Sequence, residues 1–279
     1  MRIIVPILIL TTFLFVSCSS NSSTNQMNLN QFKQLGLTVK KELPPEFIPK
    51  EINIVSVGDS LTEGIGDSTQ RGGYIPYLEE MLEMDKGIKD ANIHNFGVKG
   101  NRSDQLLKKL GSSEVKTAIK DAEIVIITIG GNDVMKVVRE NFTNLNVSAF
   151  EKQKKVYEKN LMNMMKKIRE ENPNSIVVLV GLYNPFNSWF ANISEFNEII
   201  DDWNLTSKNV LAQFPETYFV QVEDIFLEGG EQLLYADNFH PNDKGYELIA
   251  NRVHDTLIDD VFNQAVIPTY RAETEENVR

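Results

Sequence analysis

The sequence predicts an α/β fold in which a parallel sheet of five strands is covered by helices on both faces. Three observations lead to this prediction. Short runs rich in β-branched residues alternate along the chain with longer segments of helical periodicity. The strand runs are apolar at nearly every position, which is typical of strands buried on both faces. Glycines and small polar residues follow the strand runs, at the place where such folds bind ligands.

The five expected strands are apolar runs bounded by turn residues. The first, residues 52–57, stops at Gly58. The clearest are AEIVIITI at 122–129 and SIVVLVGL at 175–182, which have the pattern of fully buried strands. The other two expected strands are residues 91–95 and 218–222.

Five helices are expected between and after these strands. The clearest is 148–171, which Asn172-Pro173 ends and whose apolar residues stand at positions 150, 157, 161, 164, 165 and 168. Ser103 is a candidate N-cap, and Pro241 suits the first turn of the last helix. In chain order, the other expected helices are 74–84, 103–110, 194–214 and 241–260.

The bulk composition is that of an ordinary globular protein with a sizeable core. The chain has 279 residues, of which 42% are hydrophobic and 24% charged. We expect one folded domain over residues 50–265 and a frayed tail over 266–279. The formal net charge of −11 argues against nucleic acid as a partner and against electrostatic binding to an anionic membrane.

A signal peptide is predicted at residues 1–17. Its apolar run, 5–16, is shorter than the ~20 residues that a membrane-spanning helix needs. Cys18, the only cysteine, follows at the expected cleavage site and resembles the lipidated cysteine of bacterial lipoproteins. An ordinary secretory signal with a chance cysteine is the alternative. Residues 18–49 are then a lipidated cysteine and a disordered tether, and the protein is extracytoplasmic, either anchored to the membrane by lipid or secreted.

The segment Gly58-Asp59-Ser60 allows two interpretations. Ser60-Leu-Thr-Glu63 matches the S-x-x-E capping box, in which the serine caps the following helix. Ser60 can equally be a nucleophile at a strand end, provided that a base lies nearby. In the second case its hydroxyl is expected to point toward a histidine and not back at Glu63.

Among the three histidines, His240 is the one placed to serve as that base. His94 falls inside an expected strand and His254 inside the last helix, whereas His240 stands at a strand-to-helix junction. Asp237 precedes it by three residues, so the carboxylate can hold Nδ1–H and leave Nε2 facing a serine. A solvated turn is the alternative interpretation of this Asp-x-x-His pattern.

Four blocks of the chain resemble the GDSL family, also called SGNH hydrolases. In chain order they are Gly58-Asp59-Ser60-Leu61, Gly100 five residues after Asn95, Gly131-Asn132-Asp133, and Asp237-x-x-His240. Gly97 is the alternative to Gly100 in the second block. The blocks occur in the family's order. The resemblance implies a flavodoxin-like three-layer α/β/α sandwich with esterase or lipase activity and no metal or other cofactor.

The same resemblance implies a role for each site residue. Ser60 is the nucleophile, His240 the base, and Asp237 the carboxylate that orients the base. The backbone N–H groups of Ser60 and Gly100 and the side-chain amide of Asn132 form the oxyanion hole. An amide at a strand end suits this role because it is a neutral donor that stabilises developing charge without titrating.

Other cofactor chemistry has little support in the sequence. No Walker loop and no G-x-G-x-x-G pattern is present, so nucleotide binding is not expected. Three scattered histidines and one cysteine make a structural zinc site unexpected.

The expected substrate is a small-molecule or lipid ester. Four aromatic residues after the fourth strand either line an acyl pocket or form a lid, with packing on the next helix as the alternative: Tyr183, Phe186, Trp189 and Phe190. Two other functions remain open, namely removal of acetyl groups from cell-wall glycan and non-catalytic binding on the same fold. The complete set of site residues argues against the second.

Overall fold

The computed structural model describes residues 49–142, 146–185 and 194–262, with a single sheet at its centre. Neighbouring strands are parallel, and their order is β2-β1-β3-β4-β5. The strands are β1 (Lys50–Gly58), β2 (Ile88–Gly97), β3 (Ile124–Thr128), β4 (Ile176–Val180) and β5 (Thr217–Val220). This order is flavodoxin-like and switches direction between β1 and β3, where such folds bind their ligands. The predicted fold class is confirmed.

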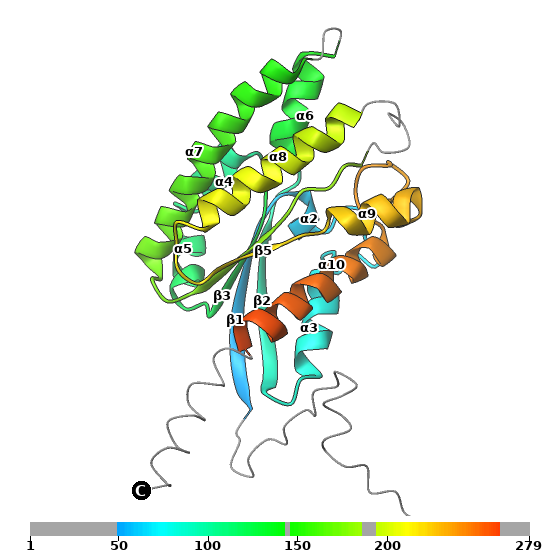
Figure 1. Cartoon of the computed structure of the whole chain (residues 1–279). Helices are drawn as coiled ribbons and strands as arrows, with labels where there is room; N and C mark the ends of the chain where they lie inside the picture. Colours follow the sequence, from blue (N-terminus) through cyan, green and yellow to red (C-terminus); the bar gives the residue numbers. More distant parts are fainter. Residues whose placement is uncertain (1–48, 143–145, 186–193, 263–279) are drawn as a thin grey trace, which may run out of the picture. The chain divides into compact units, whose positions relative to one another are not determined.

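Helices cover both faces of the sheet (Figure 1). One layer holds α4 (Ser103–Lys109), α5 (Ser113–Lys120), α6 (Gly131–Glu140), α7 (Val147–Glu171) and α8 (Ser194–Leu211). The other holds α3 (Ile75–Glu83), α9 (Glu223–Gly229) and α10 (Asp243–Thr256), which continues into η2 (Leu257–Phe262). The short helix α2 (Ser60–Glu63) follows β1 directly, and the turn η1 (Gly230–Leu233) follows α9.

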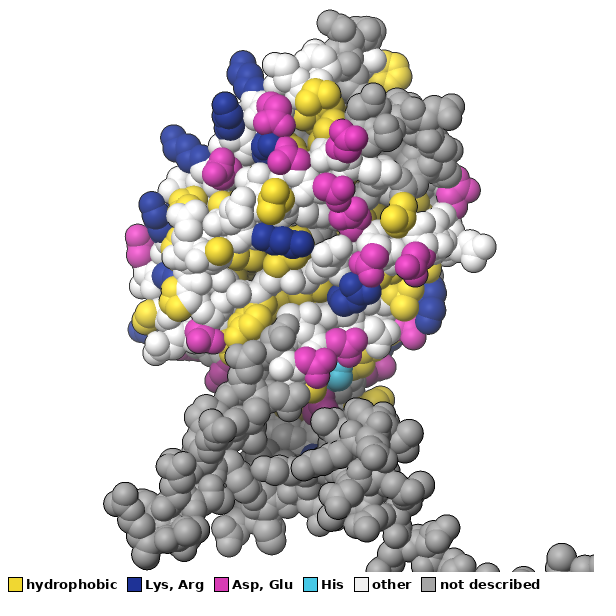
Figure 2. All heavy atoms as spheres, in the orientation of Figure 1, with side chains coloured by type: hydrophobic (Ala, Val, Ile, Leu, Met, Phe, Trp, Pro, Cys, Tyr) yellow, Lys and Arg dark blue, Asp and Glu magenta, His cyan; other side chains and the backbone are white. Residues whose placement is uncertain are grey.

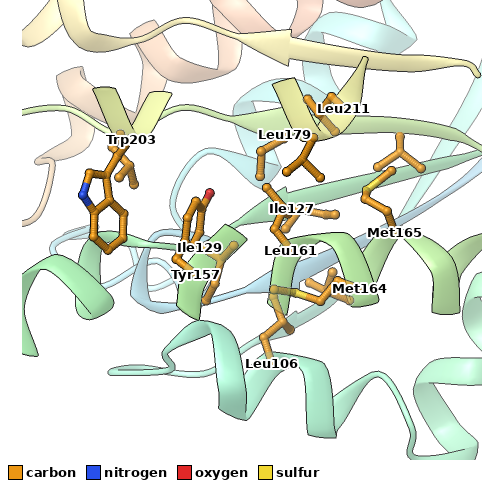
Figure 3. Packing of buried hydrophobic residues seen from close by; sticks show 14 of the residues in the cluster. Leu106, Ile127, Ile129, Tyr157, Leu161, Met164, Met165, Leu179, Trp203 and Leu211 are labelled. Atoms are coloured by element: carbon orange, nitrogen blue, oxygen red, sulfur yellow. The ribbon is translucent and has the colours of Figure 1, made fainter. Parts of the chain in front are cut away.

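The core consists of two apolar clusters, one on each face of the sheet. Side chains alternate along a strand, so Ile127 of β3 packs toward α4–α8 while its neighbour Ile126 packs toward α3, α9 and α10. Figure 3 shows part of the first cluster, where Leu161 and Met164 of α7 lie close to Leu106 of α4. Each such buried side chain contributes about 1.5–3 kcal/mol by leaving water.

The structure contains three helices that the sequence patterns did not predict: α5, α6 and α9. The segment that begins α6, Gly130-Gly131-Asn132-Asp133, has the composition of a turn. Gly130 has a φ of 119°, which only glycine adopts readily, and the chain passes from β3 into α6 through Ile129 and this glycine. Strand β2 is also longer than the predicted 91–95.

Charged side chains cover the outer helices. On the face drawn in Figure 2, Lys and Arg gather along α7, and Asp and Glu gather over α8 and α9. Within the described residues, no helix is both long and apolar enough to cross a membrane. Cys18, the predicted signal peptide and the predicted C-terminal tail lie outside the described residues.

Candidate active site

Ser60 is the first residue of α2, immediately beyond the carboxyl end of β1. The helix cap is the preceding residue, because the Asp59 carboxylate accepts a hydrogen bond of 3.1 Å from the N–H of Leu61. The Ser60 hydroxyl is therefore not used as a cap. Ser60 is 2% exposed, and its Oγ lies 2.9 Å from Nε2 of His240.

Glu63 does not form a capping box with Ser60 either. Its carboxylate accepts a hydrogen bond from the backbone N–H of Lys99, in the loop that follows β2. The S-x-x-E pattern thus describes two residues with separate partners. Glu63 ties α2 to the loop that carries Gly100.

His240 lies in the turn that leads into α10, and both nitrogens of its ring have hydrogen-bond partners. Its Nδ1 is 2.6 Å from Oδ2 of Asp237, while Oδ1 of the same carboxylate accepts the N–H groups of Phe239 and His240 at 3.0 Å each. Partial burial by itself raises the pKa of Asp237. The hydrogen bonds from the His240 ring and the two backbone N–H groups outweigh it, so that the pKa lies below its usual value. The structure thus places Ser60, His240 and Asp237 in one hydrogen-bonded chain.

Asn132 and Gly100 belong to two segments that meet, the start of α6 and the loop before α4. Asn132 is the second residue of α6, and its Nδ2 donates one hydrogen bond of 3.1 Å to the carbonyl of Asn101. An amide nitrogen carries two protons, so a second donor remains. Gly100 has a φ of 79°, and within the part of the chain that the structure describes its N–H has no hydrogen-bond acceptor.

Gly97, the alternative to Gly100, has a packing role between β2 and α2. A Cβ at this position would lie 2.1 Å from the backbone nitrogen of Glu63, so only glycine lets β2 pack against α2. Its N–H is already engaged, donating at 2.8 Å to the side-chain oxygen of Asn95. This geometry favours Gly100 as the free donor.

A buried carboxylate joins the Gly100 loop to the Asn132 helix. Asp133 is fully buried at the start of α6, and it accepts the N–H and the hydroxyl of Ser103 at 2.8 and 2.7 Å. Ser103 is the first residue of α4, three positions after Gly100. Burial raises the pKa of Asp133, although the hydrogen bonds from Ser103 and Gln153 oppose the shift.

A chain of buried hydroxyl groups lies beneath Ser60. Thr128 at the end of β3 donates to Oδ1 of Asp59 at 3.0 Å, and the Thr62 hydroxyl is 2.8 Å from that of Thr128. Because Thr128 has given its only proton to the carboxylate, Thr62 must donate to Thr128. Tyr74 and Ser56 continue the chain, 2.5 Å apart. Burial raises the pKa of Asp59 to about 7, despite the hydrogen bonds it accepts.

The loop after α2 is fastened to the first turns of α10. The N–H and hydroxyl of Ser68 donate to the two oxygens of Asp243 at 2.7 and 2.6 Å. The hydroxyl of Tyr246 donates to the carbonyl of Ile65 at 2.6 Å. These contacts join the segment that carries Ser60 to the segment that follows His240.

An apolar pocket lies beside Ser60, with an empty volume of about 570 Å³ that includes its open mouth. Ser60 and Asn132 are among its lining residues. Tyr183 is the one residue of the predicted aromatic set that the structure describes; it lines the pocket and donates its hydroxyl to the Phe239 carbonyl at 2.7 Å. Phe186, Trp189 and Phe190 lie outside the described residues.

Sequence patterns missed most of the pocket. Its walls include Val134 and Met135 of α6 and Phe196 and Ile200 of α8. The apolar VMKVV run after Gly-Gly-Asn-Asp was the available signal for α6. The described residues include no group of three or more His, Cys, Asp or Glu side chains that could hold a metal ion.

The chain matches a family model over most of this fold. The model is described as the GDSL-like lipase/acylhydrolase family, and it matches residues 56–248. The chain belongs to this family. This GDSL-like hydrolase is therefore an ester hydrolase by family, and the matched segment contains Ser60, Gly100, Asn132, Asp237 and His240.

Two curated relatives and one solved structure resemble this GDSL-like hydrolase. It is 40% identical to the protein YpmR of Bacillus subtilis strain 168, over 75% of this chain and 82% of that one. It is 25% identical to the spore germination lipase LipC of Bacillus licheniformis, over 72% and 94% of the two chains. The crystal structure of the lipase Lip_vut3 from a goat rumen metagenome aligns with a TM-score of 0.65 at 25% identity, covering 72% of this chain and 95% of that one.

Proposed function

We propose that this chain is an extracytoplasmic serine esterase that hydrolyses carboxylic esters through Ser60, His240 and Asp237. One observation carries the proposal. A buried serine hydroxyl lies 2.9 Å from Nε2 of a histidine whose Nδ1 lies 2.6 Å from a carboxylate. A nucleophile, a base and an orienting group are what acyl transfer by a serine requires.

In the first half of the proposed reaction, Ser60 forms an acyl-enzyme. Its Oγ attacks the ester carbonyl carbon while its proton passes to Nε2 of His240, and the carbonyl electron pair moves onto oxygen. The C–O bond to the alcohol then breaks, and the alcohol oxygen takes the proton from Nε2. Asp237, kept anionic by its lowered pKa, holds Nδ1–H and stabilises the imidazolium that forms between these steps.

In the second half of the proposed reaction, water takes the place of Ser60 as the attacking group. Nε2 takes a proton from water, whose oxygen attacks the acyl carbon. The bond to Ser60 breaks, and the serine oxygen takes the proton back. The acid leaves, and the free enzyme returns to its starting protonation state.

The negative oxygen of each tetrahedral intermediate needs hydrogen-bond donors, and we assign three groups to this role. They are the N–H of Ser60 at the start of α2, the N–H of Gly100, and the second proton of Asn132 Nδ2. One such donor typically contributes ~10²–10³ in rate.

Replacing the nucleophile tests the proposal. With p-nitrophenyl acetate as substrate, Ser60→Ala should lower kcat by about 10³-fold or more, because among the described residues Ser60 supplies the hydroxyl bonded to Nε2 of His240. Ser113→Ala, at an exposed position on α5, is the matched control and should stay within about twofold of the wild type. Full activity in Ser60→Ala would refute the mechanism.

The extracytoplasmic location is proposed from the N-terminal sequence. A short apolar run followed by a single cysteine at the cleavage site favours a lipid anchor on Cys18. Metabolic labelling with a palmitate analogue should mark the full chain in membranes of a bacterial host. Cys18→Ser should abolish the label, and a variant that is labelled like the wild type would exclude Cys18 as the anchor.

A further inference from the structure

The pocket beside Ser60 lies between the sheet and two helices of one layer. Its walls come from the ends of β3 and β4 and from α6 and α8. Ser60 and Asn132 both line it, so a substrate whose carbonyl carbon meets Ser60 Oγ must place one of its substituents here. Two questions follow: what chemistry that substituent has, and whether it belongs to the acid or the alcohol.

The walls of the pocket are hydrocarbon. Its lining includes Val134 and Met135 of α6, Phe196 and Ile200 of α8, and Val180 and Leu182 at the end of β4. Among the polar side chains that line it, Thr128 donates to Asp59, Tyr183 donates to the Phe239 carbonyl, and the second amide proton of Asn132 is the one assigned to the reacting carbonyl oxygen. A sugar hydroxyl placed among these walls would lose its hydrogen bonds to water without replacement, at a cost of about 1–3 kcal/mol. An aliphatic chain gains from the same burial.

The position of His240 decides between acid and alcohol. The departing alcohol oxygen must reach Nε2 to collect its proton, so the alcohol has to leave on the imidazole side of Ser60. Neither His240 nor Asp237 is among the described residues that line the pocket, and only Phe239 of that turn reaches it. Because the imidazole does not border the pocket, the leaving alcohol is assigned to a place outside it.

We propose that this pocket binds the hydrocarbon chain of the acyl group, and that the preferred substrates are esters of aliphatic acids longer than acetate. The inference rests on the proposed serine mechanism and goes beyond it by assigning the acyl side and its chemistry. It also separates this chain from an enzyme dedicated to removing acetyl groups, since acetate would leave the pocket empty.

The first experiment compares chain length on the two sides of the ester bond. With the wild-type protein, kcat/KM should rise from methyl acetate to methyl octanoate by at least about tenfold, as methylenes are buried. It should rise much less from methyl acetate to octyl acetate, which is lengthened on the alcohol side instead. A flat or falling acyl series, or a larger gain on the alcohol side, overturns the inference.

The second experiment alters one wall. Met135 lines the pocket from α6 and is only half-buried, so the fold can tolerate a change of size there. Met135→Trp should lower the octanoate-to-acetate ratio of kcat/KM at least about tenfold, and Met135→Ala should move the optimum to longer acids. Leu205→Trp, on the exposed side of α8, should leave the ratio unchanged. Equal ratios in all three variants would overturn the assignment.

Failure of this inference and failure of the proposed mechanism give different results. If Ser60→Ala hydrolyses acetate and octanoate esters as well as the wild type does, the serine mechanism fails. If hydrolysis depends on Ser60 but ignores acyl length and the size of residue 135, the mechanism stands and the pocket assignment fails.

Discussion

At the scale of single residues, Asp59 caps helix α2, and Ser60 is left to contact His240. The first turn of α2 needs a side-chain acceptor for its free N–H groups, and Asp59 supplies it. Ser60 is thereby left with an unused hydroxyl and an unused N–H at the positive end of the helix. The hydroxyl meets His240, and the N–H is available to a negative oxygen. One carboxylate therefore leaves free both groups that the proposed acyl transfer takes from this serine.

At the scale of elements, the proposed oxyanion hole requires the starts of two helices to keep a fixed separation. The N–H of Gly100 precedes α4, and the amide of Asn132 belongs to α6, so their separation depends on how these helices meet. The two hydrogen bonds from Ser103 to Asp133 hold the start of α4 against the start of α6. We therefore expect Asp133 to act as a positioning residue that does not touch the substrate.

The variant Asp133→Asn tests this expectation. Its amide would place a donor against the N–H or the hydroxyl of Ser103, and the start of α4 should move away from Asn132. We expect kcat to fall about tenfold or more with a much smaller change in KM, and the affinity for a boronic acid transition-state analogue to fall in parallel. Steady-state kinetics and inhibitor titration on the folded variant measure both.

A matched control for this variant lies on α7. Gln153 donates to the same carboxylate at 3.2 Å but takes no part in the contact between α4 and α6. Gln153→Ala should therefore change kcat by no more than about twofold. If Asp133→Asn lost stability but kept its kcat, or if both variants lost kcat equally, the positioning role would be wrong.

The same elements explain which parts of the site are predictable from sequence. Strands such as AEIVIITI are recognisable by composition, and polar residues at their carboxyl ends must gather at one edge of a parallel sheet. Ser60 and Asn132 can therefore be grouped from the sequence alone, whereas His240 follows α9 and η1 and is joined to them by the family's order of blocks. Helix α6 cannot be recognised in this way, because a glycine-rich start looks like a turn and its apolar stripe is short. The sequence points to the aromatic run after β4 as the pocket, because the apolar VMKVV run of α6 is short and follows a glycine-rich segment that resembles a turn.

At the scale of the whole molecule, the topology brings together residues that are 180 positions apart. Ser60 follows β1, an inner strand of the sheet, and His240 precedes α10, on the opposite face from α4–α8. The contacts of Ser68 with Asp243 and of Tyr246 with Ile65 join these two segments directly. The geometry of the serine and the histidine is thus part of the tertiary fold and is lost when the chain unfolds.

The buried carboxyl under the site links the stability of the whole molecule to pH. The pKa of Asp59 is about 7 in the fold, against an ordinary value of 3.8 for an aspartate. Between about pH 4 and pH 7 the folded chain keeps a proton that the unfolded chain has lost. The contribution of this group to stability is therefore greatest below about pH 4 and is lost as the pH rises through about 7, at up to about 1.4 kcal/mol per pH unit.

Comparison of Asp59→Asn with the wild type isolates this contribution. The asparagine oxygen can still accept from Leu61 and Thr128, but the side chain no longer ionises. Other titrating groups are common to both proteins and cancel in the difference. Urea unfolding from about pH 4.5 to about pH 8 should show the variant gaining stability relative to the wild type up to about pH 7 and no further. Asp121→Asn, at an exposed position, controls for the loss of one negative charge. A difference that is constant with pH, or that grows as the pH falls, would mean that Asp59 is ionised in the fold throughout this range.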